Sequence, residues 1–308
     1  MLAGPATDWV DGGAGRDTLS GGDGNDSLHG GAGADRLYAG QGDDTLEGNA
    51  GDDFVMGDGG NDTANGGLGA DTIYGGNGDD TLSGGADDDK LDGDYGSNVI
   101  MGGEGNDALA TMGDGISRLD GGAGDDLLGV WAAYVREGAG IVTANGGDGA
   151  DIIEFQRQIG NTEVLATGGA GADVFKVQGG GEQTSFIVTD VDIRMGGDKI
   201  DPMANWWITP VVGDVIANGV VSFVQSGADT LVRYDADGRA GTAYEAQTVM
   251  LLQAVQASDL SSAHLVRPII LAGAHADGEL SGSAGVEGAV VEPVPAALVG
   301  QPELTWMS

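Results

Sequence analysis

The sequence of 308 residues contains no cysteine, which excludes disulfide bonds, thiol catalysis and cysteine-ligated zinc. Only 12 residues are Lys or Arg against 49 Asp or Glu, so the formal net charge is −37. A chain this acidic repels nucleic acid and anionic lipid surfaces, so we expect no nucleic-acid partner and take cations as its partners. Aromatic residues are few and 61 positions are Gly, which leaves most of the chain without the large side chains of a conventional core.

Three further absences restrict the class of protein. Only 7 residues are Pro and glycine keeps no three-residue period, which excludes collagen. Residues 1–10 have no positively charged segment before an apolar one, so we expect no cleavable signal peptide. No apolar run is long enough to span a bilayer, so we expect a soluble protein without a membrane-spanning segment. Low hydrophobicity with high net charge predicts disorder, at least in the metal-free chain.

A nine-residue repeat runs without a slip from Gly12 to Ala110, and its first units read GGAGRDTLS and GGDGNDSLH. The register extends back to Asp8, and more widely spaced copies follow in residues 121–129, 146–154 and 168–176. Position six is a carboxylate in all units but one: Asp17, Asp26, Asp35, Asp44, Asp53, Asp62, Asp71, Asp80, Asp89, Asn98 and Asp107. Position eight is always apolar: Leu19, Leu28, Leu37, Leu46, Val55, Ala64, Ile73, Leu82, Leu91, Ile100 and Leu109.

This combination of residues suits a hard cation. Gly adopts the positive φ of tight turns without steric cost and lets backbone carbonyls come close to a ligand. Calcium prefers six to eight oxygen ligands from carboxylates and carbonyls, so one Asp with two or three carbonyls is half a site. We expect positions seven to nine to form a very short strand whose eighth side chain points inward. Burial alone would hardly stabilise such strands, so we predict that folding is coupled to metal.

The pattern G-G-x-G-x-D-x-U-x resembles the RTX family of calcium-binding nonapeptide repeats. The resemblance implies an all-β fold, a right-handed parallel β-roll in which equivalent turns stack every eighteen residues along two opposite edges. One ladder of sites would use Asp17, Asp35, Asp53, Asp71, Asp89 and Asp107, and the other Asp8, Asp26, Asp44, Asp62 and Asp80. The full set of metal-site residues that we predict is Asp8, Gly13, Gly15, Asp17, Gly22, Gly24, Asp26, Gly31, Gly33, Asp35, Gly40, Gly42, Asp44, Asp53, Asp62, Gly67, Gly69, Asp71, Gly76, Gly78, Asp80, Asp89, Gly103, Gly105, Asp107, Gly122, Gly124, Asp126, Asp151 and Asp173.

The charge of the repeats agrees with this interpretation. Residues 1–129 hold 27 Asp and Glu against 4 Lys and Arg, a net of −23, so on the order of ten Ca²⁺ would bring the region near neutrality. A solvated acidic tail is the alternative, but a tail would not keep its acids at one position of a glycine frame. At position six of its repeat Asn98 keeps an oxygen ligand but lacks the negative charge of Asp, so we expect a weaker site there. If the register is continued, Ile116 falls at position six, and we expect that turn to bind nothing.

We divide the chain into a regular β-roll over residues 1–129, wider coils over 130–201, a β-rich cap over 202–271 and a flexible tail over 272–308. The stretch from Gly171 to Asp201 resembles the closing segment that follows RTX repeats in serralysin-type proteins. We expect Trp206 and Trp207 to belong to the core of the cap. The turn at 235–238 is either one more calcium site or an ordinary Asx turn.

No catalytic motif is found, so we expect no enzymatic activity. His29, His264 and His275 do not form the H-E-x-x-H spacing of zinc proteases, and we expect His29 to be a solvated outward side chain. No G-x-S-x-G sequence is present. The many carboxylates occupy equivalent environments, whereas a glycosidase pair needs dissimilar ones.

The resemblance implies a calcium-induced folding module of an extracellular bacterial protein that leaves the cell through the type I secretion machinery. The uncleaved signal would lie near the C-terminus, although residues 303–308 depart from the ending typical of secreted proteases. One alternative is a calcium-stiffened adhesin or matrix protein at the cell surface, which would self-associate or bind extracellular glycan. Another is the non-catalytic C-terminal part of a larger secreted enzyme, because the repeat register is already running at Asp8.

Overall fold

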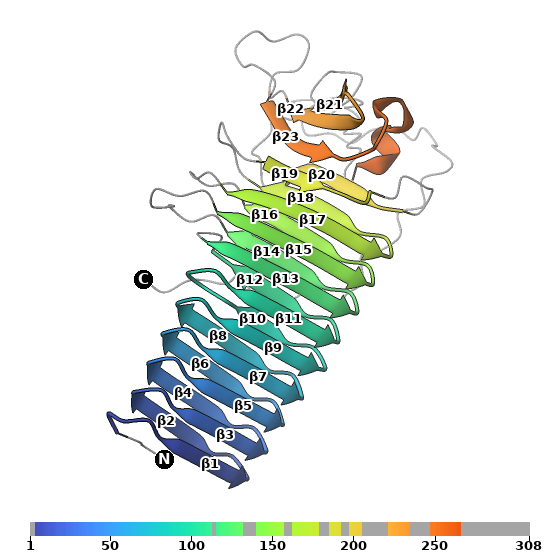
Figure 1. Ribbon diagram of the computed structural model, residues 1–308. Coiled ribbons are helices and arrows are strands. Elements are labelled where there is room, and N and C mark those ends of the chain that lie inside the picture. The colour runs from blue at the N-terminus through green and yellow to red at the C-terminus, as the bar shows by residue number, and fades with distance from the viewer. Residues whose placement is uncertain are drawn as a thin grey trace, which may run out of the picture. The chain divides into compact units, whose positions relative to one another are not determined.

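The computed structural model describes residues 4–112, 115–131, 140–156, 162–178, 185–191, 197–204, 221–234 and 247–265. Contacts divide the chain into residues 1–271 and 272–308, and the second unit lies outside the described residues. Figure 1 shows successive coils of the first unit stacked on one another, from β1 onward. The described part is built almost entirely of β-strands, as the sequence predicts.

Two parallel sheets form the walls of the coils, and each strand pairs with the strand two places away in the sequence. The first sheet contains β1 (Trp9–Ala14), β3 (Ser27–Ala32), β5 (Thr45–Ala50), β7 (Thr63–Leu68), β9 (Thr81–Ala86), β11 (Val99–Glu104), β13 (Ile116–Ala123), β15 (Ile141–Asp148), β17 (Glu163–Ala170) and β19 (Ser185–Val188). The second contains β2 (Thr18–Asp23), β4 (Arg36–Gln41), β6 (Phe54–Gly59), β8 (Thr72–Asn77), β10 (Lys90–Asp92), β12 (Ala108–Thr111), β14 (Leu127–Trp131), β16 (Ile152–Gln156), β18 (Val174–Gln178) and β20 (Lys199–Ala204). Two nonapeptides therefore make one coil.

The strands are longer than the three residues predicted from positions seven to nine. Most span six residues, because pairing continues through the glycine pair into position three of the next unit. Gly22 pairs with Gly40 in β2 and β4, and Gly13 pairs with Gly31 in β1 and β3. Glycine thus serves both the strand and the turn, so little of each nonapeptide is left outside the ladder of hydrogen bonds.

The core is the column of position-eight side chains between the two sheets. Leu28, Leu46 and Leu82 are fully buried in the first sheet, as are Leu37 and Ile73 in the second. Because strand side chains alternate between faces, the positions flanking the eighth residue point outward, and only the eighth residue and the small Gly or Ala at position one face the narrow interior. The apolar column predicted from the repeat is therefore confirmed.

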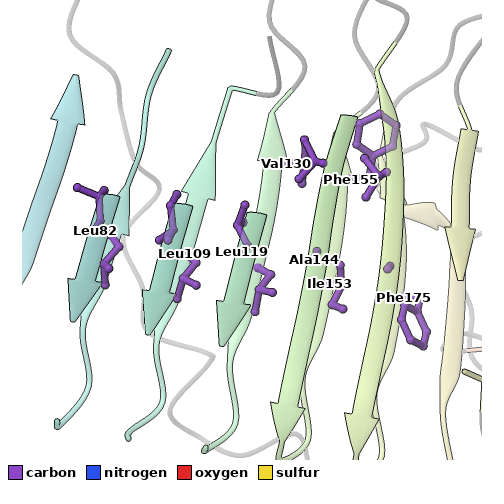
Figure 2. Close-up of a cluster of buried hydrophobic side chains, with 14 of the residues drawn as sticks. Leu82, Leu109, Leu119, Val130, Ala144, Ile153, Phe155 and Phe175 are labelled. Atoms are coloured by element: carbon purple, nitrogen blue, oxygen red, sulfur yellow. The ribbon is translucent and has the colours of Figure 1, made fainter. Parts of the chain in front are cut away.

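The coils after β13 contain a second apolar column. Val130 and Phe155 in the even-numbered strands are fully buried two residues after the position-eight column (Figure 2). Phe155 also stacks on Phe186 of β19, with ring centroids 6.0 Å apart and an interplanar angle of 11°. Longer coils with larger side chains thus replace the narrow glycine-framed coils toward the C-terminal end of the solenoid.

An antiparallel sheet continues the first wall beyond β19. β23 (Gln247–Leu252) pairs in parallel with β19. β22 (Asp229–Tyr234) pairs antiparallel with β23, and β21 (Val221–Ser226) pairs antiparallel with β22. Two short 3-10 helices, η2 (Ala257–Asp259) and η3 (Ser262–His264), come next. These strands cover the edge of the last coil, which would otherwise expose unpaired backbone groups.

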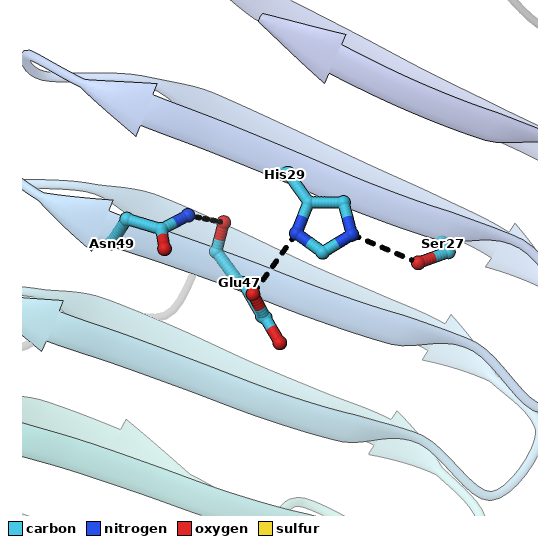
Figure 3. Close-up of polar contacts among 4 residues, drawn as sticks. All are labelled: Ser27, His29, Glu47 and Asn49. Carbon is cyan, nitrogen blue, oxygen red and sulfur yellow. Dashed lines mark hydrogen bonds and ion pairs between the residues drawn. The ribbon is translucent and has the colours of Figure 1, made fainter. Parts of the chain in front are cut away.

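His29 departs from the prediction of a solvated side chain. Its Nδ1 lies 2.9 Å from Glu47 Oε2 in the next coil, and its Nε2 lies 3.2 Å from Ser27 Oγ (Figure 3). The ring also packs against Trp9, with centroids 5.7 Å apart. Strands β1, β3 and β5 are thereby linked across the outer face of the first sheet.

Candidate metal sites

The position-six carboxylates form two ladders, one along each edge of the solenoid. The backbone N–H of Asp35 donates to Asp53 Oδ1 at 2.7 Å, and that of Asp44 donates to Asp62 Oδ1 at 2.8 Å. The same bond links coil to coil at 2.6–3.0 Å along both edges, from Asp8 to Asp80 before the odd-numbered strands and from Asp17 to Asp173 before the even-numbered ones. The eighteen-residue stacking implied by the resemblance is the stacking observed as far as Asp107.

In thirteen of these carboxylates the Oδ2 atom has no partner, and in twelve of the thirteen, all but Asp17, Oδ1 accepts a backbone N–H. Asp8, at the start of its ladder, differs because its Oδ2 accepts the N–H of Gly4 at 2.9 Å. The thirteen unpaired Oδ2 atoms are buried and accept no hydrogen bond from the protein. The residues concerned are Asp17, Asp26, Asp35, Asp44, Asp53, Asp62, Asp71, Asp80, Asp89, Asp107, Asp126, Asp151 and Asp173. All of these residues except Asp17 are at most 3 % exposed, so bulk water does not replace the missing donor. Buried polar atoms are nearly always paired, so a whole series of unpaired oxygens points to a ligand.

In eight turns the free Oδ2 and a backbone carbonyl oxygen of the next coil both lie within about 3 Å of one point, the place that a Cβ on the position-one glycine would occupy. A Cβ built on Gly30 would lie 2.7 Å from Asp35 Oδ2 and 2.9 Å from the carbonyl oxygen of Gly48 in the next coil. At Gly12 the carbonyl oxygen of Gly30 and Asp17 Oδ2 converge in the same way, at 2.6 and 3.1 Å. Two acceptors aimed at one point repel each other, and a cation between them reverses the sign of the interaction.

The chemistry of this donor set fits calcium. Every candidate ligand is a carboxylate or carbonyl oxygen, which hard cations prefer, and no thiol or imidazole takes part. Among the described residues no three or more His, Cys, Asp or Glu side chains come together in one place. The turns would therefore hold the ion with few carboxylates and with several carbonyl oxygens, as the glycine frame suggests.

Burial raises the pKa of the ladder carboxyl groups in the middle and C-terminal coils. The pKa of Asp62, Asp71, Asp89 and Asp126 rises to about 7 and that of Asp151 and Asp173 to about 6, mainly through desolvation. The backbone N–H bond to Oδ1 lowers the pKa, while neighbouring carboxylates raise it further. Without a cation, ionisation of the ladder is opposed, and a bound cation would favour the charged form.

The predicted turn glycines have the backbone conformation that the sequence requires. All of them have φ between +90° and +137°, and they lie at positions two and four of their repeats. At Gly31, whose φ is +108°, a Cβ would collide with the carbonyl group of Gly13 in the preceding coil. Where other residues replace these glycines they are Asn or Asp with φ of 52–79°, namely Asn49, Asp58, Asp87 and Asp94. Asn and Asp are the side chains that tolerate this region best.

The structure corrects one position-six assignment and extends one ladder. A one-residue insertion places Ser117, 3 % exposed, at position six of its coil, whereas Ile116 is 69 % exposed beside it. Asp198, which the prediction omitted, accepts the backbone N–H of Asp173 at 3.0 Å and continues the even-strand ladder. Asp190 accepts the N–H groups of Gly168 and Gly169 at 2.9 Å. In the sequence Asp198 follows a Gly and, like the ladder carboxylates, precedes a strand. The residues around it lack the regular glycines of the repeat, so the repeat pattern alone does not identify it.

Several sequence predictions lie outside the described residues. They are the pair Trp206 and Trp207, the carboxylate turn at 235–238, and the tail and secretion signal in residues 272–308. No helix in the described part of the chain is long and apolar enough to cross a membrane.

A known family of calcium-binding repeats matches the repeat region of this chain. The family described as RTX calcium-binding nonapeptide repeat (4 copies) matches residues 2–37, 29–64, 38–73, 56–91, 74–109 and 138–157. Repeats of this family are typical of secreted bacterial proteins. The chain is also similar to the solution structure of the AlgE6R3 subunit of the Azotobacter vinelandii mannuronan C5-epimerase, at 25% identity over 68% of this chain and 93% of that one, with a TM-score of 0.24. No curated protein matches the sequence.

Proposed function

This chain is an RTX nonapeptide-repeat protein whose calcium-binding repeats form a β-roll, and we propose that it works as a calcium-gated folding module outside the cell. In this proposal the Asp ladders take up several Ca²⁺ ions, on the order of ten, and at neutral pH the solenoid forms only when they are bound. Its role is binding and folding rather than catalysis.

The observation that carries the proposal is the series of buried Oδ2 atoms without a hydrogen-bond partner. Leaving one buried polar atom unpaired costs about 1–3 kcal/mol, and the cost is larger for a charged group. That cost recurs along both edges of the solenoid, while the regular nonapeptide coils have only one narrow apolar column to offset it. A cation at each turn would turn these repulsive oxygens into ligands.

In this proposal the difference in free calcium between the inside and the outside of the cell controls folding. Extracellular calcium sites typically have dissociation constants of about 10⁻⁴–10⁻³ M, well above the free calcium inside a cell. The chain would therefore stay unfolded before export, which suits passage through the type I secretion machinery. Outside, millimolar calcium would bind only the folded state and shift the equilibrium by mass action.

Circular dichroism of the whole protein tests the proposal. We expect a disordered spectrum after metal is stripped and a β-rich spectrum in several millimolar Ca²⁺. Mg²⁺ at the same concentration is the control, because it demands near-ideal octahedral geometry and releases its water reluctantly. A spectrum and a melting temperature that do not change between chelator and calcium would overturn the proposal.

A calcium-stiffened surface or matrix protein is the second candidate, because one outer face carries a row of aromatic rings. Tyr38, Phe54 and Tyr74 lie on β4, β6 and β8, with successive ring centroids 5.8 and 5.9 Å apart. The corresponding positions of β5, β7 and β9 carry Thr and other polar residues. Rings of this kind offer stacking surface to a glycan or to a second copy of the chain.

Glycan-array binding and sedimentation velocity in calcium distinguish the two candidates. A surface protein should bind a glycan or self-associate, and replacing the three rings by Ala should abolish that interaction while the fold remains. The matched control replaces Thr45, Thr63 and Thr81 on the opposite face by Ala. A calcium-loaded chain that stays monomeric and binds no glycan would leave only the first candidate.

A further inference from the structure

The ladder before the odd-numbered strands changes its chemistry at Asn98. The Asn98 side chain is fully buried, and its Oδ1 accepts the backbone N–H of Asp80 at 2.9 Å, as an Asp would. Its Nδ2 donates to the carbonyl oxygen of Gly93, the position-one residue of the same repeat, at 2.9 Å. Unlike the thirteen carboxylates, this side chain therefore has a partner for each of its polar atoms.

The amide nitrogen of Asn98 occupies the place of the unpaired oxygen in the other turns. A Cβ built on Gly93 would lie 2.6 Å from Asn98 Nδ2, just as one on Gly30 would lie 2.7 Å from Asp35 Oδ2. The orientation of the amide follows from its surroundings, because Oδ1 must face an N–H donor and Nδ2 a carbonyl acceptor. The amide thus supplies in this turn the positive partner that a cation would supply in an Asp turn.

The same edge remains free of carboxylates at position six in the next coils. Ser117 Oγ accepts the N–H of Asn98 at 3.0 Å and donates to the carbonyl oxygen of Gly96 at 3.3 Å. In register with Ser117 come Val142, Val164 and Phe186, all buried. The edge therefore passes from carboxylate to amide, then to hydroxyl, and finally to apolar packing.

The opposite edge shows no such change. Asp107, Asp126, Asp151 and Asp173 keep the unpaired Oδ2 and the N–H bond to the next coil, and Asp198 follows them. The carboxylate ladder thus ends at Asn98 on one edge only, while the ladder on the other edge continues into the wider coils.

We propose that Asn98 closes its turn without a cation and so ends the calcium ladder on one edge of the roll. Coils up to Asp80 then take calcium on both edges, and coils beyond Asn98 take it only on the edge before the even-numbered strands. The C-terminal coils consequently need less calcium for each coil and order at lower free calcium than the N-terminal ones. This inference rests on the proposed calcium function of the turns.

Asn98→Asp is the test, because it restores the carboxylate without changing the size of the side chain. Equilibrium dialysis with elemental analysis at saturating calcium should find one more bound ion per chain than in the wild type. Hydrogen exchange followed by mass spectrometry at limiting calcium should show that residues 93–112 of the variant need more calcium for protection. An unchanged ion count together with unchanged protection would overturn the inference.

Two variants on the opposite edge keep the inference testable even if Asn98→Asp does not fold. Asp107→Asn should lose one calcium ion yet keep its turn protected from exchange, because the amide can close it. Asp107→Ala should lose both the ion and the protection. Equal loss of protection in the two variants would contradict closure by an amide. A wild-type chain that binds no calcium would instead refute the proposed function, so the two failures are distinguishable.

Discussion

Replacing Asp71 by Ala removes one rung of the calcium ladder. Asp71 Oδ1 accepts the buried N–H of Asp53 at 2.8 Å, and its Oδ2 is one of the unpaired oxygens. Leaving that N–H unpaired costs about 1–3 kcal/mol. Losing an ion that is present at 100 times its dissociation constant costs about 2.7 kcal/mol more. We therefore expect a loss of about 4–6 kcal/mol in saturating calcium, which lowers Tm by on the order of 10 °C in a domain of this size.

Thermal melts followed by circular dichroism over a series of calcium concentrations measure this effect. Besides the lower Tm, the Tm of Asp71→Ala should rise less steeply with calcium, because one ion fewer is linked to folding. Asp52→Ala is the matched control: its exposed Oδ1 accepts only the N–H of Ala70, at 3.1 Å, so its loss should cost about 1 kcal/mol or less. Equal losses in the two variants, or an unchanged calcium dependence in Asp71→Ala, would refute the reasoning.

Two further predictions concern pH and the core. The folded pKa of Asp62, Asp71, Asp89 and Asp126 is about 7 against an ordinary value of 3.8, so the metal-free fold is favoured below about pH 4 and loses stability as pH rises through 7. Metal-stripped protein should therefore gain β-signal in circular dichroism as pH falls from 8 to 4, and a signal that is independent of pH would contradict this. Leu46→Ala removes a fully buried position-eight side chain and should cost about 2–5 kcal/mol in urea denaturation. The number of bound calcium ions should not change in this variant, and a lower number would show that core and metal sites are not separable.

The repeat makes the regular half of the solenoid predictable from sequence alone. Because position six recurs every nine residues and two units close one coil, the two Asp edges and the apolar column follow from the register. Strand length was wrong, because the glycine pair extends each ladder while it also forms the turn. Ser117 was missed because one inserted residue moves the register after Ala110.

The wider coils are harder to predict for a physical reason. Beyond residue 130 one edge is closed by apolar side chains such as Val142 and Val164, so position six carries no carboxylate there to mark the turn in the sequence. Asp198 stands alone after a segment without the repeat, so its place in the ladder depends on tertiary stacking. The closing role of the Asn98 amide likewise depends on the carbonyl of Gly93, which only the folded turn brings within reach.

The position of calcium in the turns is the central claim, and anomalous diffraction from crystals grown in calcium tests it most directly. The account predicts anomalous peaks about 2.3–2.6 Å from the Oδ2 atoms on both edges, for example at Asp35 and Asp44. It predicts none at Asn98, while the opposite edge keeps its peaks as far as Asp173. Oδ2 atoms that bind water or protons, with no peak between them and the position-one carbonyl oxygens, would contradict it.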